Sequence, residues 1–69
     1  MKFSARNQVI GTIKAINVGA VNSEVVLEVA EGVEMVSIIT NSSVKSLGLK
    51  VGQQAYAVIK ASNVMIAVD

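Results

Sequence analysis

Hydrogen-bond donors are concentrated in three short segments of this otherwise strongly apolar chain. Ser4 and Arg6, the only arginine, stand two residues apart near the N-terminus, so they share one face of an extended segment. The second segment is residues 40–43 (TNSS) and the third is residues 60–62 (KAS). Guanidinium, ammonium, hydroxyl and backbone N–H groups are the donors that hold a small oxyanion. None of these segments contains a carboxylate, so the ligand that they predict is an anion.

Each segment also has a simpler interpretation. Residues 40–43 could only cap a helix, although free N–H groups at a helix start also favour an anion. Lys60 could be a solvated lysine at a strand end, and the segment around Arg6 could be a surface arm. The three segments together are more suggestive than any one of them. Composition alone does not establish that they meet in space.

Composition excludes several kinds of site and predicts self-association. The chain has 69 residues and contains neither cysteine nor histidine, which excludes disulfides and any site built from thiolate or imidazole ligands. Its length predicts one domain over residues 1–69. Hydrophobic residues make up 52% of the chain and charged residues 16%. So small a domain has too little interior for that many apolar side chains, and the surplus predicts subunit contacts.

Catalysis and nucleic-acid binding are both disfavoured. No histidine is available as a general base, and the acidic residues fall mostly at alternating strand positions, so no enzyme activity is expected. Binding of single-stranded nucleic acid needs aromatic platforms in a basic groove. The chain has one phenylalanine, one tyrosine and a net charge of +1, so nucleic acid is not an expected partner.

No membrane association is expected either. No apolar run approaches the roughly 20 residues of a membrane-spanning helix. The N-terminal residues lack the basic-then-apolar pattern of a signal peptide. A cytoplasmic location is therefore the expectation.

Alternation of apolar and polar residues dominates the chain and predicts strands. Strands are expected at about residues 3–17, with a bend at Gly11, and at about 21–30, 34–39, 54–60 and 64–68. N-cap residues at 40–43 and Gly48 at the far end predict one short helix at about residues 41–47. This order predicts an all-β fold, a five-stranded OB-like Greek-key barrel with one short helix between strands 3 and 4.

Several motifs resemble those of the molbindin (Mop) family of molybdate-binding proteins. The opening residues 4–11 (SARNQVIG) are similar to the family's N-terminal signature, and residues 57–65 (AVIKASNVM) to its C-terminal one. Further similarity lies in residues 22–25 (NSEV), 38–44 (IITNSSV) and 47–49 (LGL). The resemblance covers essentially the whole chain and implies a Mop/TOBE-type OB domain.

The resemblance also implies a function and an assembly. The stand-alone members bind molybdate or tungstate reversibly and are proposed to store or buffer cytoplasmic molybdate. They assemble as homo-hexamers, trimers of dimers, with oxyanions held between subunits. The resemblance implies no enzyme activity, no cofactor other than the oxyanion ligand and no directly coordinated metal ion.

Carried over by motif, the main oxyanion site would combine all three donor segments. Its expected residues are Ser4, Ala5, Arg6, Thr40, Ser43, Lys60, Ala61 and Ser62. A second class of site, around a threefold axis, would use backbone N–H groups of the turn Val18, Gly19 and Ala20. No ligand role is assigned to Asn41, and Asn7 and Gln8 are expected only to hold the N-terminal arm or an interface in place.

Two other functions stay open at the level of sequence. The chain could be a structural or partner-binding oligomerisation module whose anion sites are incidental. It could also bind a molybdenum–pterin cofactor, although Phe3 and Tyr56 are the only aromatic residues available to stack on a pterin.

Overall fold

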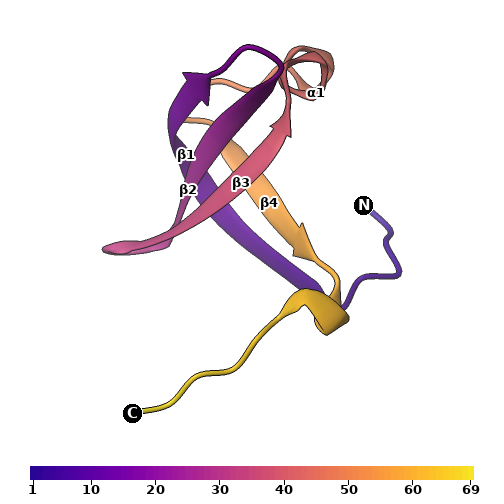
Figure 1. Ribbon diagram of the computed structural model, residues 1–69, viewed down its shortest axis with the longest axis vertical. Coiled ribbons are helices and arrows are strands. Elements are labelled where there is room, and N and C mark those ends of the chain that lie inside the picture. The colour runs from indigo at the N-terminus through magenta and orange to yellow at the C-terminus, as the bar shows by residue number, and fades with distance from the viewer.

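A four-stranded antiparallel sheet, curled on itself, forms the body of the protein (Figure 1). The computed structural model describes all 69 residues. The sheet has the strand order β3-β2-β1-β4, which leaves one edge free on β3 and one on β4. In chain order the elements are β1 (Asn7–Val18), β2 (Asn22–Ala30), β3 (Val33–Thr40), α1 (Asn41–Leu47), β4 (Gln54–Ile59) and a 3-10 turn, η1 (Ala61–Asn63).

The long strand β1 organises the sheet because it has two partners along its length. Its first half pairs with β4, from Asn7 opposite Ile59 to Thr12 opposite Gln54. Its second half pairs with β2, ending at Val18 opposite Ser23. The register shifts by one residue at Lys14, and such a bulge bends a strand and increases its twist. The strand therefore passes from one wall of an open barrel to the other.

The core of the single chain is small. Ile13, Val25 and Leu27 are the only buried hydrophobic residues, and only four of the 69 residues are buried. Val25 and Leu27 alternate with half-buried residues along β2, so they lie on the inward face of that strand. The partly buried hydrophobics that surround this core are Ile16, Val29, Ile39, Val44, Leu49, Ala55 and Ala57.

The helix α1 has the bounds that its capping residues predict. Thr40 has an extended backbone, and its Oγ1 accepts a hydrogen bond from the N–H of Ser43, which is a side-chain N-cap. Gly48 ends the helix with a left-handed conformation at φ 63°, a region that glycine enters without penalty. The predicted helix at residues 41–47 is confirmed. It contains no buried residue and covers one end of the barrel.

A three-residue ion-pair group links β1 to β2 and β3. The Nζ of Lys14 lies 3.1 Å from a carboxylate oxygen of Glu28 and 3.8 Å from one of Glu34. The hydrogen bond to Glu28 and the charges of both glutamates raise the pKa of Lys14. A raised lysine pKa means that this stabilisation is fully present at neutral pH and is lost only as the pH rises through that pKa.

The predicted fifth strand at residues 64–68 does not form within the single chain, and the sheet has four strands instead of five. After η1 the C-terminal segment runs extended, away from the sheet, with no ladder partner (Figure 1). Met65, Ile66 and Val68 are 86–92% exposed. Alternation of apolar and polar residues marks a segment suited to a strand, but a strand also needs a sheet edge to pair with. The turn at η1 directs this segment away from both free edges of the sheet. The all-β, OB-like class is confirmed.

The residue at position 11 must be glycine for steric reasons. A Cβ there would lie 2.7 Å from the carbonyl oxygen of Glu28 and 2.9 Å from Cγ of Leu27. We expect Gly11→Ala to lower the free energy of unfolding by about 1–3 kcal/mol, because the contact with β2 is largely backbone and cannot move aside. Urea denaturation followed by circular dichroism measures it. The neighbouring exposed substitution Thr12→Ala is the control, and equal stability of the two variants would contradict the steric account.

Candidate functional site

Six of the eight residues expected in the main site lie together around one hollow. Ser4, Ala5 and Arg6 come from the arm before β1, and Lys60, Ala61 and Ser62 come from the segment after β4. The hollow has a volume of about 510 Å³ and no other residue lines it. We call it the basic hollow. Two donor segments more than 50 residues apart in the chain are thus neighbours in space.

Strand pairing explains why these segments meet. Asn7 opens β1 and lies opposite Ile59, which closes β4, so the residues before one and after the other emerge side by side. The side-chain Nδ2 of Asn7 donates to the carbonyl of Ile59 at 3.3 Å. The Nε2 of Gln8 donates to the carbonyl of Ala5 at 3.2 Å. The two amide side chains therefore fasten the junction and the arm, which is the holding role expected of them.

The electrostatics of the basic hollow favour an anion. Arg6 and Lys60 both line it, and no acidic residue does. The only ion pairs in the protein are those of Lys14, so neither cation of the hollow has a carboxylate partner. A second feature is η1, in which the N–H of Asn63 donates to the carbonyl of Lys60 at 2.9 Å. The first N–H groups of such a turn have no partner within it, which leaves those of Ala61 and Ser62 available.

The start of helix α1, which carries Thr40 and Ser43, lies at the opposite end of the sheet from the chain segments before β1 and after β4 that line the basic hollow (Figure 1). The hollow adjoins the Asn7 end of β1, whereas Val18 at the other end lies opposite Ser23. Ser23 in turn lies opposite Ile39, the residue before Thr40. At about 3.3 Å per residue, the twelve residues of β1 separate the two groups by on the order of 30 Å. A single chain does not bring all eight expected residues together.

The two hydroxyls at the start of α1 are already organised. Thr40 Oγ1 accepts from the N–H of Ser43 at 3.1 Å and lies 2.9 Å from Ser43 Oγ, to which it donates. Thr40 is exposed and Ser43 is partly exposed. The pair therefore offers the Ser43 hydroxyl as a donor to a group that approaches from outside the chain.

In the turn expected to form the second site, the backbone N–H groups of Gly19 and Ala20 differ in their partners. Gly19 donates its N–H to the carbonyl of Asn22 at 2.9 Å, and Val18 is the last residue of β1. Within the single chain the N–H of Gly19 therefore closes the turn and does not point to a ligand. No backbone carbonyl accepts the N–H of Ala20, which is the donor that remains.

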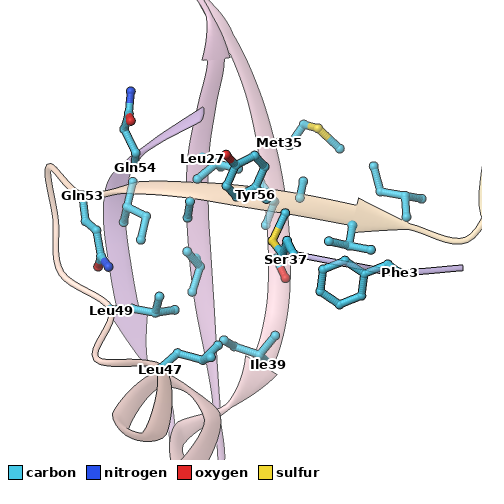
Figure 2. Close-up of a pocket in the computed structure, with 18 residues that line it drawn as sticks. Phe3, Leu27, Met35, Ser37, Ile39, Leu47, Leu49, Gln53, Gln54 and Tyr56 are labelled. Carbon is cyan, nitrogen blue, oxygen red and sulfur yellow. The ribbon is translucent and has the colours of Figure 1, made fainter. Parts of the chain in front are cut away.

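A second, apolar hollow opens on the inner side of the barrel and was not expected from the sequence. It has a volume of about 520 Å³ and is lined mainly by hydrophobic side chains. Figure 2 shows Leu47 and Leu49 beside α1 at one end and Phe3 at the other, with Tyr56 between. We call it the apolar groove. No charged residue lines it, so it offers no partner for the charged groups of a pterin cofactor.

Asn41 is the residue near the site that the sequence reasoning missed. Its side chain contacts both Ser23 and the turn at Gly19. No periodic signal marks it, because its partners precede it by 18 and 22 residues. The fact that Ser23 occupies an inward position of an apolar strand is the one clue that the sequence offered. No group of three or more acidic, histidine or cysteine side chains that could hold a metal ion occurs.

Comparison with known proteins places the chain in a family. The model of the TOBE domain matches residues 4–66. The molybdenum-pterin-binding protein 3 of Clostridium pasteurianum is 48% identical over 66 residues, which are 96% of this chain and 97% of that protein.

Two solved structures share the fold. The molybdate binding protein from Sporomusa ovata is 35% identical, with a TM-score of 0.91, over 99% of this chain and all of that one. The cytoplasmic molybdate-binding protein ModG is 52% identical with a TM-score of 0.88, and the match covers 94% of this chain and 46% of that one. With its donor segments, fold and relatives together, the chain belongs to the TOBE-domain family of small molybdenum-pterin-binding (Mop) proteins, which are binding proteins and not enzymes.

Proposed function

We propose that this protein binds molybdate, or tungstate as a near-equivalent ligand, reversibly and without catalysing a reaction. The observation that carries the proposal is the basic hollow, in which two unpaired cations stand beside hydroxyl and backbone donors with no carboxylate. The naming of relatives for molybdate and molybdenum-pterin binding supports it.

The donor chemistry suits a fully deprotonated tetrahedral dianion. Arginine and lysine donate and do not accept hydrogen bonds, and backbone N–H groups are donors as well. Every oxygen of molybdate can accept. Hydrogen phosphate carries an O–H that the two cations and the backbone N–H groups cannot accept, so only a hydroxyl oxygen of the site could pair with it; a poorly satisfied O–H costs binding energy. Sulfate has the right charge but is smaller, so cavity size must discriminate against it.

We place the complete main site between subunits. In one chain the basic hollow and the hydroxyls of Thr40 and Ser43 lie at opposite ends of β1. Both groups are expected ligands, and their separation within a chain supports a site in which the hollow of one copy meets the helix start of another. All eight residues then act on one anion: Ser4, Ala5, Arg6, Thr40, Ser43, Lys60, Ala61 and Ser62.

The exposed apolar surface supports a homo-oligomer, which we propose to be a hexamer arranged as a trimer of dimers. The apolar groove is open, and both sheet edges are free. The C-terminal residues 64–68 form an extended apolar segment without a partner. We propose that a second copy receives this segment along its sheet or groove, where the segment gains the ladder and burial that its own chain does not provide.

Storage follows from reversible binding at such sites. A ligand that binds only the assembled form stabilises it by about RT ln(1 + [L]/Kd) per site, so the oligomer fills when free molybdate is plentiful and empties when it is scarce. We propose that this buffering takes place in the cytoplasm, the location named for ModG. No helix of the protein has the length and hydropathy of a membrane span. The proposal includes no nucleic-acid partner, because only one phenylalanine and one tyrosine could stack on bases.

Ligand selectivity tests the function directly. We expect isothermal titration calorimetry to show saturable binding of molybdate and tungstate, with sulfate and phosphate at least about tenfold weaker because of size and protonation. Binding should weaken as salt rises, because part of the attraction is between charges. Equal, weak binding of all four anions would contradict a selective molybdate site.

The substitution Arg6→Ala tests the basic hollow. It removes one of the two cations and a forked donor, so we expect molybdate affinity at the main site to fall by about 10- to 100-fold. Equilibrium dialysis measures affinity and stoichiometry, and size-exclusion chromatography with light scattering checks that assembly persists. The control is Lys50→Ala, which removes an exposed positive charge outside the hollow. Unchanged affinity in Arg6→Ala would show that the hollow is not the site.

The exposed C-terminal segment has a separate test. We expect Ile66→Asp combined with Val68→Asp to lower the oligomer mass measured by light scattering, because charges cannot be buried against an apolar partner without large cost. The control Asp69→Asn alters charge at the same terminus and leaves the apolar residues in place. An unchanged mass in the double variant would contradict docking of this segment on a second copy.

A further inference from the structure

One of the four buried residues of the protein is polar. Ser23 is 1% exposed, and the other buried residues are Ile13, Val25 and Leu27. Burying a hydroxyl is unfavourable unless it is hydrogen-bonded. The Oγ of Ser23 donates to Oδ1 of Asn41, and no buried side-chain polar atom lacks a partner. The buried hydroxyl is therefore satisfied by one side chain, that of Asn41.

Asn41 makes three hydrogen bonds to a single connection of the chain. Besides accepting from Ser23, its Nδ2 donates to the carbonyl of Gly19 at 2.9 Å. Its backbone N–H donates to the carbonyl of Val21 at 2.8 Å. The amide has one orientation that satisfies these partners, because the opposite one would set its oxygen against the carbonyl of Gly19. All three partners lie in or just after the turn between β1 and β2.

These bonds fix two candidate oxyanion segments relative to each other. Thr40 directly precedes Asn41 in the chain, and Ser43 lies two residues after it. On the other side of the amide stands the turn that carries the free N–H of Ala20. Helix α1 is seven residues long and has no fully buried residue, and Val44 is its one side chain packed against the core. Thr40 is held by its ladder pairing with Asn22, and the side-chain hydrogen bonds of Asn41 add a constraint on where the helix starts.

We propose that Asn41, anchored by the buried Ser23, is a positioning residue that sets the hydroxyls of Thr40 and Ser43 and the turn at Ala20 in one fixed arrangement for ligand binding. This inference rests on the proposed function and deepens it. In this proposal the amide acts within the chain, where its Oδ1 accepts from Ser23 and its Nδ2 donates to Gly19. Its loss acts on both classes of site at once, whereas loss of Arg6 acts on the main site alone.

The test uses neutral substitutions, so that no charge is added near the anion. Four full-length proteins are compared by equilibrium dialysis with sodium molybdate: wild type, Arg6→Ala, Asn41→Ala and the double variant. We expect Asn41→Ala to weaken main-site affinity by about tenfold or more, as two net hydrogen bonds imply. The residual binding that Arg6→Ala retains at the second site should disappear in the double variant.

Matched variants separate positioning from mere stability. Ser23→Ala should reproduce the loss of affinity, and Ser23→Thr, which keeps the hydroxyl, should restore most of it. Asn17→Ala is the control, because Asn17 is an exposed asparagine at the same end of β1 with one hydrogen bond, to Glu24. Thermal unfolding of each variant is recorded, and dialysis is performed well below every transition, so that only folded protein is compared.

The outcomes are distinct. A lower melting temperature for Asn41→Ala, with affinity and stoichiometry within about twofold of wild type, would overturn the positioning role and leave a structural one. Absence of residual binding in Arg6→Ala would overturn the link between two sites. Failure of the wild type itself to bind molybdate would overturn the proposed function, and that result is read before any variant is compared.

Discussion

The antiparallel pairing of β1 with β4 is the constraint on which the rest of the structure depends. It places Asn7 opposite Ile59 and so brings two donor segments from the two ends of the chain to one hollow. No local interaction could do this, because the segments are more than 50 residues apart. The same strand then runs on to pair with β2, which carries the third donor segment to the far end of the molecule. The long strand β1 thus builds the basic hollow at one of its ends and keeps the start of α1, with the remaining expected ligands, at the other.

Assembly and ligand binding are consequently linked in this account. The isolated chain buries three hydrophobic side chains and leaves much apolar surface exposed, including the whole C-terminal segment. Apolar contact between copies supplies burial that the chain lacks. If the helix start of one copy completes the hollow of another, an anion neutralises cations that would otherwise face an interface without a partner. Ligand and apolar contact then stabilise the same assembly.

Local signals in the sequence predicted local structure well and long-range structure poorly. The helix at residues 41–47 was predicted with its observed bounds, because Thr40 and Gly48 mark its ends directly. The strand at residues 64–68 was predicted from alternation and is not formed, since alternation does not say which edge, or which chain, accepts a strand. The six residues of the basic hollow came from a family resemblance; spacing alone left their meeting undecided.

The hydrogen bonds of Gly19 and Asn41 could not be predicted from the sequence. The N–H of Gly19 looks available in the sequence, but the turn closes on it through Asn22. Asn41 looks like an ordinary cap residue, but its amide links to Ser23 in strand β2 and to Gly19 in the turn before that strand. Hydrogen bonds of this kind depend on the sheet register, and that register follows from the packing of the whole chain.

Complementation between two variants with weakened main sites tests most directly whether two chains build one site. One variant carries Arg6→Ala, and the other carries Thr40→Ala with Ser43→Ala. Each is unfolded, mixed in equal amounts and refolded together, and molybdate binding is measured by dialysis. A shared site has an intact hollow and an intact helix start with a probability of one half each, so about one quarter of the main sites should recover in random mixed oligomers. If mixing restores no binding above that of the separate variants, although light scattering shows oligomers and mass spectrometry shows that they are mixed, the intersubunit account is contradicted.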